Sequence, residues 1–474
     1  MQPNYEVEMR LNVRTPMRDG VELSSDIYLP RAEGKFPTVL MRTPYDNNGE
    51  AMIEKGRRLA NNGYACVIQD VRGRWDSDGT HYALFNHAED GFDTQEWIGQ
   101  QEWSDGNIGM AGGSYGGWAQ WQSAPLRSEY LKCLAPRVMC GDLYTGLIHP
   151  GGAFQLNVAL TWGMRTNGRT AQSIEYHNWT EAFRSTPLVD MDHLAGRELR
   201  FWRDWVSHTE YDDYWDSVNI ETKWDQFAVP ALVMGGWYDL YSQNAFINFN
   251  GLKLNGRTEE ARQSRLIVGP WPHALSASTK TGDIDFGVNS MVDLESLELR
   301  WFDYWMRGAD NGVADEAPLT LFIMGVNEWR DEHEWPLART DWQKWNFHSS
   351  GTANTLGGDG SLSLSEPGDE TPDTFVFDPE HPAQTVGGNN CCSPHIVAWG
   401  PYDQRGVEMR ADVLCYTSNP LESGIEVTGP IKVVLYAATD GSDTDWTAKL
   451  VDVSDTGYAQ NLCDGIIRAR YRDS

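Results

Sequence analysis

The sequence predicts an α/β fold in which a parallel sheet carries helices on both faces, a helical segment interrupts the sheet, and a β-sandwich follows. Three observations lead to this prediction. Apolar strand-like runs alternate with helical stretches up to residue 121 and again from residue 231. Between them, residues 141–221 carry aromatic side chains at helical intervals and no strand-like run. From residue 318 onward, short β-like runs alternate with polar loops.

The first part of the chain supplies the alternating elements. Residues 8–30 predict a hairpin around Asp19-Gly20, because Asp-Gly is favoured in two-residue turns. Buried-type strands follow at 36–42 and 64–70, with helices expected at 50–60 and 88–99. A strand, a helix and a second strand in this order form a crossover unit with parallel strands, so we expect helices on both faces.

The next apolar strand ends in Gly112-x-Ser114-x-Gly116, which fits a nucleophile elbow. A side chain two residues either way from the serine meets a neighbouring element on such a tight strand-to-helix turn. The turn lifts the hydroxyl clear of the sheet and leaves backbone N–H groups of the helix start facing a developing oxyanion. Because glycine makes up 46 of 474 residues, the motif is weak evidence until a base and an acid are found.

Two later strands end in the residue types that such a serine needs. The apolar run 231–236 leads into Asp239, and the run 265–269 leads into His273. In this type of fold the nucleophile, acid and base follow in the order Ser, Asp, His, each after a strand. We therefore expect His273 to accept the proton of Ser114 and Asp239 to orient the imidazole and stabilise its cation.

The remaining elements complete the predicted architecture. Residues 141–221 are interpreted as a helical cap over the active-site face, with its aromatic side chains packed mainly inward. A helix at 293–306 closes the α/β domain. Strands of the sandwich are expected at 319–325, 341–347, 431–438, 446–452 and 465–471, with a solvated polar loop at 349–370.

Composition narrows the classes of function. The formal charge of −30 argues against a nucleic-acid partner, because phosphates are repelled. No run approaches the roughly 18 apolar residues of a membrane helix. The N-terminus lacks a basic and apolar leader, so we expect a cytoplasmic protein. We expect a small-molecule ester or amide as partner and no membrane contact; a homodimer is compatible with these features.

The seven cysteines do not predict a metal site. No C-x-x-C spacing is present, so we expect no metal ligands, no cofactor and no effect of chelators. Cys391 and Cys392 are adjacent in the chain. For this pair, two reduced thiols in a loop are favoured over a strained vicinal disulfide.

Ordered motifs along nearly the whole chain resemble the CocE/NonD family of serine hydrolases, which includes bacterial cocaine esterase and is related to the Xaa-Pro dipeptidyl-peptidases. The matching stretches are residues 17–21, 42–46, 69–73, 109–115, 236–239, 269–273, 324–330 and 443–450. The resemblance implies an α/β-hydrolase domain with a helical cap and a C-terminal jelly-roll-like domain. It divides the chain into a first hydrolase part (1–140), the cap (141–224), a second hydrolase part (225–312) and an incomplete jelly roll (313–474).

The resemblance also implies roles for single residues. Tyr45 is expected to donate its hydroxyl to the oxyanion, beside the backbone N–H of Tyr115. Trp162 and Tyr241 fall near positions that line the acyl pocket in the family; packing within the cap and the hydrolase core is their alternative role. Relatives continue beyond the stretch that matches 464–472, so we expect a C-terminally truncated fragment or a trimmed chain.

These features predict a cofactor-free serine esterase that works through an acyl-enzyme. The alternative is an Xaa-Pro dipeptidyl-peptidase or an amide or β-lactam acylase with the same triad. For an amine-recognising enzyme of that kind, Glu210, Asp212 and Asp213 are candidate carboxylates, but a solvated acidic cluster is the favoured explanation in a chain this acidic. A non-catalytic binding protein is a third reading, and the complete set of Ser, Asp and His argues against it.

Overall fold

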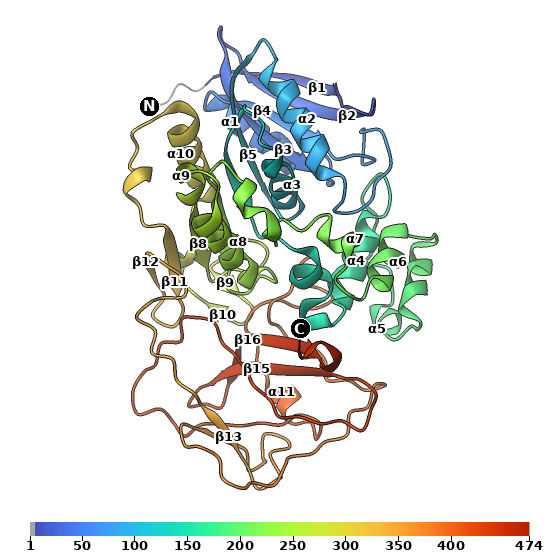
Figure 1. Cartoon of the computed structure of the whole chain (residues 1–474), viewed down its shortest axis with the longest axis vertical. Helices are drawn as coiled ribbons and strands as arrows, with labels where there is room; N and C mark the ends of the chain where they lie inside the picture. The colour runs from blue at the N-terminus through green and yellow to red at the C-terminus, as the bar shows by residue number, and fades with distance from the viewer. Residues whose placement is uncertain (1–4, 474) are drawn as a thin grey trace.

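The computed structural model describes residues 5–473 and is organised around one ten-stranded sheet (Figure 1). The strand order is β1-β2-β4-β3-β5-β6-β7-β8-β11-β12. The bounds of these strands are β1 (Val7–Pro16), β2 (Glu22–Pro30), β3 (Phe36–Thr43), β4 (Ala65–Asp70), β5 (Ser104–Gly113), β6 (Leu131–Arg137), β7 (Leu232–Gly236), β8 (Arg265–Gly269), β11 (Leu319–Ile323) and β12 (Glu328–Glu332). The strands from β4 to β11 in this order run parallel, and antiparallel strands flank them at both edges.

Alternation along the central strands sends side chains to both faces of the sheet. In β3, Leu40 joins one core cluster, while Val39 and Met41 join the other. The first face carries α2 (His87–Gly99), α3 (Tyr115–Ser123) and α8 (Ser242–Asn255), and the second carries α1 (Glu50–Asn61) and α10 (Leu294–Arg307). Burial of both faces explains why these strands are almost continuously apolar.

The cap forms between β6 and β7, as the sequence predicts. It contains the helices α4 (Leu156–Thr166), α5 (Trp179–Ala182), α6 (Arg200–Ser207) and α7 (Asp213–Asp216), joined by short 3₁₀ and π segments. Its tryptophans at 202, 205 and 215 are almost fully buried and join the same core cluster as α3. The cap aromatics therefore fasten this segment to the α/β domain. Among residues 5–473, no helix combines the length and apolar character needed to cross a membrane.

Two sheet elements differ from the sequence prediction. The strand β6 carries no strong signal of its own and was not predicted. The run at 319–325, expected in the C-terminal sandwich, is β11 of the central sheet and pairs in parallel with β8. Its side chains at 319 and 321 are fully buried, so the sheet gains a buried strand where β8 alone would leave an open edge.

The C-terminal part is rich in extended chain but poor in paired strands. It contains β13 (Asn346–His348) with β14 (Ser361–Ser363), β15 (Asp445–Val453) with β16 (Ala459–Arg468), and the short helix α11 (Arg405–Glu408). The predicted strand at 431–438 does not form, since its apolar side chains are exposed and it has no strand neighbour among the described residues. The jelly-roll layering stays a prediction.

In Figure 1 the orange and red C-terminal part lies at one end of the molecule, beside the green cap. The remaining short elements are α9 (Glu259–Arg262) and the hairpin of β9 (Lys280–Thr281) and β10 (Ile284–Asp285). Contacts tie the C-terminal part to the cap: the Tyr471 hydroxyl donates to the carbonyl of Thr209 at 2.7 Å. The C-terminal part also reaches the loops after β7 and β8, where the predicted site residues lie.

Candidate active site

Ser114 lies at the turn between β5 and α3, with a backbone that few non-glycine residues adopt. Its φ is 55° and its ψ is −121°. Gly112, two residues earlier, has a φ of 141°, and a Cβ there would lie 3.1 Å from the Cα of Gly116. The turn is held by the Ser114 backbone N–H, which donates to the carbonyl of Arg137 in β6 at 2.9 Å. The strained backbone and close packing match the predicted elbow geometry.

The residue after the serine opens α3. Because Tyr115 is the first residue of this helix, its backbone N–H has no carbonyl partner within the helix. Its phenol points away from that end and is buried, with its hydroxyl 2.7 Å from Nε2 of His87. Burial holds the pKa of His87 well below its usual range, so this imidazole is neutral and its Nε2 can accept a hydrogen bond from the phenol. The side chain of Tyr115 thus anchors the first turn of α3 against the start of α2.

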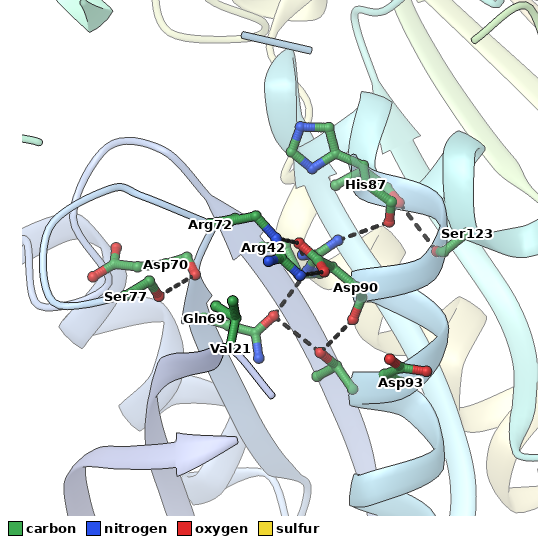
Figure 2. Close-up of polar contacts among 12 residues, drawn as sticks. Val21, Arg42, Gln69, Asp70, Arg72, Ser77, His87, Asp90, Asp93 and Ser123 are labelled. Carbon is green, nitrogen blue, oxygen red and sulfur yellow. Dashed lines mark hydrogen bonds and ion pairs between the residues drawn. The ribbon is translucent and has the colours of Figure 1, made fainter. Parts of the chain in front are cut away.

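A buried polar network underlies this anchor (Figure 2). The guanidinium of Arg42 donates to the side-chain oxygen of Gln69 at 2.9 Å and to the carbonyl of His87 at 3.0 Å. Figure 2 shows Arg42 and Arg72 converging on Asp90, which Arg72 contacts at 2.6 Å. These bonds fix the end of β3 against the start of α2, and they compensate the cost of burying a charged group.

Tyr45 follows β3 and holds its hydroxyl beside the elbow. The indole Nε1 of Trp162, from the cap helix α4, donates to the Tyr45 hydroxyl at 2.8 Å. Desolvation around the hydroxyl raises the pKa of Tyr45, whose side chain is still partly exposed, and hydrogen bonds with Trp162 and Ser114 partly offset that rise. Since an indole N–H can only donate, the phenol oxygen accepts from Trp162 and keeps its own proton for another partner. That proton is the one an oxyanion needs.

Asp239 and His273 meet at the ends of β7 and β8. The Nδ1 of His273 lies 2.7 Å from Oδ1 of Asp239, whose side chain is fully buried. The two loops approach closely because Gly236 has no side chain: a Cβ there would lie 2.2 Å from the Trp271 carbonyl oxygen. The Tyr238 N–H also donates to that carbonyl, at 3.0 Å. With its Nδ1 hydrogen directed at a carboxylate, the imidazole presents Nε2 as the basic atom.

The two predicted pocket residues lie against this group. Trp162 contacts both oxyanion candidates, through its hydrogen bond to Tyr45 and a ring contact of 5.9 Å with Tyr115. Tyr241 is buried at the start of α8, with its ring centroid 5.9 Å from that of His273. The seven residues predicted from the sequence fall into two contact groups. Ser114, Tyr45, Tyr115 and Trp162 lie at the ends of β3 and β5 and in the cap, and Asp239, His273 and Tyr241 lie after β7 and β8.

The C-terminal part adds residues that the sequence prediction missed. The side-chain amide of Asn389 donates to the carbonyls of Trp237 at 2.9 Å and Asp239 at 2.8 Å. Asn389 lies 150 residues beyond Asp239, in a loop without regular pattern, so no spacing signals this contact. Nearby, Cys391 and Cys392 form a disulfide, which corrects the expectation of two reduced thiols. Their sulfur atoms and a ring nitrogen of His273 all lie within 4.8 Å of one another.

Comparisons with known proteins identify the family of the chain. Residues 19–275 match the model of the X-Pro dipeptidyl-peptidase (S15 family), and residues 311–474 match the X-Pro dipeptidyl-peptidase C-terminal non-catalytic domain. The chain is 36% identical to a cocaine esterase of Rhodococcus sp. (strain MB1 Bresler), over 99% of this chain and 84% of the relative. It is 24% identical to a putative serine esterase of Mycobacterium bovis, over 99% of this chain and 82% of the relative.

Solved structures share the whole fold. An aminopeptidase from the marine sediment archaeon Thaumarchaeota archaeon superposes with a TM-score of 0.81 at 23% identity, covering 100% of this chain and 83% of that chain. An α-amino acid ester hydrolase superposes with a TM-score of 0.79 at 24% identity, covering 100% and 84%. At these identities the likeness concerns the fold: an α/β-hydrolase-type domain followed by a β-rich C-terminal domain.

Proposed function

The chain belongs to the S15 family and to its CocE/NonD-type hydrolases, and on that premise we propose that it is a serine hydrolase that cleaves carboxylic esters through an acyl-enzyme. The observation that carries the proposal is the 2.7 Å hydrogen bond between His273 and the buried Asp239. It lies at the same edge of the sheet as the strained turn of Ser114. The 36% identity to a cocaine esterase supports an ester as substrate.

The proposed reaction follows from the positions of these groups. Ser114 Oγ attacks the ester carbonyl while Nε2 of His273 takes its proton, and Asp239 stabilises the imidazolium that forms. The hydroxyl of Tyr45 and the backbone N–H of Tyr115 donate to the oxyanion of the tetrahedral intermediate. When the C–O bond breaks, the imidazolium protonates the leaving alkoxide. A water molecule, deprotonated by His273, then hydrolyses the acyl-enzyme and restores the serine.

The amide-cleaving alternative has a further requirement, an available carboxylate for a free amine, and the structure supports this alternative less well. A peptidase that recognises the free amino group of its substrate needs an unpaired carboxylate to bind it. Among the candidates from the sequence, Asp212 caps α7 and contacts Nδ1 of His208 at 2.6 Å, and Glu210 accepts from the Tyr471 hydroxyl at 2.9 Å. These two carboxylates already have local partners, and Asp213 is exposed in the first turn of α7. We therefore place the ester reaction first and the Xaa-Pro dipeptidyl-peptidase or acylase reaction second.

The test is steady-state hydrolysis of short-chain p-nitrophenyl esters and aminoacyl-prolyl p-nitroanilides by the unmodified chain and Ser114→Ala. We expect ester turnover to fall by about 10⁶-fold in the variant, to the level left by binding and the oxyanion donors. Tyr45→Phe is expected to lose about 10²- to 10³-fold in kcat, because one oxyanion donor is gone while the triad remains. Anilide turnover above ester turnover would move the protein to the peptidase alternative. Folded protein without Ser114-dependent turnover of either substrate contradicts the proposal.

A further inference from the structure

The vicinal disulfide lies beside His273, and the proposed reaction uses the histidine but not the two cysteines. Cys391 is almost fully buried, whereas Cys392 and His273 are partly exposed. The ligand atoms of these three residues all lie within 4.8 Å of one another. In a tetrahedral zinc site with bonds of about 2.0–2.3 Å, ligand atoms are spaced more closely than 4.8 Å, so the three side chains are within reach of one cation once the two sulfur atoms have separated.

We propose that reduction of the Cys391–Cys392 disulfide creates a binding site for a soft divalent cation such as Zn²⁺ or Cd²⁺, with His273 as the third ligand. A dithiol reductant supplies two electrons and two protons: the S–S bond breaks, two thiols form, and the reductant becomes a disulfide. The cation then displaces the two thiol protons, giving two metal–thiolate bonds and one metal–imidazole bond. In the oxidised chain the sulfur atoms are bonded to each other and supply no thiolate.

The surroundings of His273 suit a metal ligand. Its Nδ1 is 2.7 Å from the carboxylate of Asp239, which fixes the ring and leaves Nε2 to bind the cation. A carboxylate behind a metal-binding histidine is a recurrent arrangement, because it orients the ring and raises its basicity. Three protein ligands leave a fourth position for water. The partial exposure of Cys392 provides a path of entry from solvent.

The consequence for activity rests on the proposed function. If Nε2 of His273 is the catalytic base, a bound cation occupies the lone pair that takes the serine proton. We therefore expect the reduced chain, but not the oxidised chain, to be inhibited by micromolar Zn²⁺ and reactivated by a chelator. The metal site itself stands on the three side chains alone and is tested without any substrate.

The binding experiment uses the full chain, reduced with dithiothreitol and freed of reductant under argon. Cd²⁺ is added while the ultraviolet thiolate-to-cadmium absorption is recorded. We expect one Cd²⁺ per chain in the reduced protein and no such absorption after reoxidation. Cys391→Ser/Cys392→Ser is expected to lose the absorption. The matched control Cys415→Ser/Cys463→Ser removes two other partly exposed cysteines and is expected to keep it.

His273→Gln tests the third ligand. In the reduced protein we expect the cadmium–thiolate absorption to persist with an affinity weakened by about tenfold or more, because one of three protein ligands is lost. If the reduced unmodified chain shows no more cadmium–thiolate absorption than Cys391→Ser/Cys392→Ser, the metal site is overturned. This conclusion holds whether or not the protein hydrolyses esters. Stoichiometric binding with unchanged affinity in His273→Gln overturns the role of the histidine. Active, metal-loaded protein without inhibition, together with weakened binding in His273→Gln, would instead overturn the proposed role of His273 as the catalytic base.

Discussion

The catalytic part and the C-terminal part bury their apolar side chains to very different degrees. The twelve largest fully buried side chains all lie between residues 28 and 301. Beyond residue 340, the buried apolar residues are Ala353, Cys391 and Ala459, while Val434 and Tyr436 are exposed by 62% and 103%. Since apolar burial provides most of the free energy of folding, the catalytic part is the more strongly stabilised of the two.

The weakly buried part nevertheless reaches the site. Asn389 bonds two carbonyls of the loop that holds Asp239, and the Cys391–Cys392 disulfide lies beside His273. Stability and chemistry are therefore divided unevenly. The large sheet carries the main core and the three residues of the proposed triad, and the C-terminal part adds Asn389 and the disulfide beside the proposed acid and base. The following variants test that division, from the largest effect to the smallest.

Asp239→Asn is expected to lower the rate of catalysis strongly while the catalytic part stays folded. The amide keeps the shape of the carboxylate, but it favours the wrong imidazole tautomer and cannot stabilise the cation. We expect kcat to fall by about 10⁴-fold, equivalent to about 5 kcal/mol. Ester kinetics and thermal unfolding of the same preparation measure both quantities. A loss below tenfold in a folded protein contradicts the assignment of Asp239.

A pair of truncations tests the difference in burial directly. Phe302, in α10, is fully buried, and Phe302→Ala is expected to lower the free energy of unfolding by about 3–5 kcal/mol. Tyr436→Ala removes a ring of similar size from the exposed segment of the C-terminal part, and we expect a change within about 0.5 kcal/mol. Urea unfolding of both variants provides the measurement. Equal destabilisation would show that the exposed segment packs against a partner in solution.

Asn389→Ala tests the contribution of the C-terminal part to the site. The variant leaves the carbonyls of Trp237 and Asp239 without their side-chain donor, at a cost of about 1–2 kcal/mol. We expect kcat/KM to fall by about 5- to 30-fold through a displaced acid loop. Asn354→Ala serves as the matched control, because its amide bonds two carbonyls within the C-terminal part. If both variants have normal kinetics, the C-terminal part does not position the acid.

The pH dependence of stability is expected to arise mainly in the catalytic part. Burial raises the pKa of Asp70, at the end of β4, to about 8. Between about pH 4 and 8 the folded state therefore keeps a proton on Asp70 that the unfolded state has already released. The free energy of unfolding falls as pH rises through this window, by at most about 1.4 kcal/mol per pH unit. Asp70→Asn is expected to flatten that decline.

Asp403, in the C-terminal part, provides the opposite case. The neighbouring Arg405 holds its pKa at about 2, so its contribution to stability is lost only in acid, as pH falls toward 2. Unfolding of Asp70→Asn and Asp403→Asn at several pH values distinguishes the two carboxyl groups. An unchanged slope in Asp70→Asn above pH 4 contradicts the buried, protonated state of Asp70.

The sequence was most informative where local pattern and burial agree. The strands β3, β4, β5, β7 and β8 were predicted because both of their faces are buried, which makes them continuous apolar runs. Ser114, Asp239 and His273 each follow one of these strands, so chain order alone placed them at the same edge. By contrast, the run at 431–438 has β-forming residues but no strand neighbour, and a strand depends on its partner rather than on propensity.

Other parts of the site depend on contacts between distant residues. Asn389 reaches Asp239 across 150 residues, and no local pattern in its loop indicates the two bonds. No sequence motif indicates the cluster of His273, Cys391 and Cys392, because its members come from two separate loops and the two cysteines are adjacent. The hydrogen bond between Trp162 and Tyr45 likewise joins the cap to the end of β3. Such contacts follow from the tertiary fold.

The measurement that tests the central claim most directly is covalent labelling of the nucleophile. The chain is treated with a fluorophosphonate, digested, and analysed by mass spectrometry. We predict a single adduct on the peptide that contains Ser114, with loss of ester hydrolysis in proportion to labelling, and no adduct in Ser114→Ala. Asp239→Asn, which keeps the serine but weakens its activation, should label much more slowly. Labelling at another serine, or ester hydrolysis that persists when Ser114 is fully modified, would contradict the account.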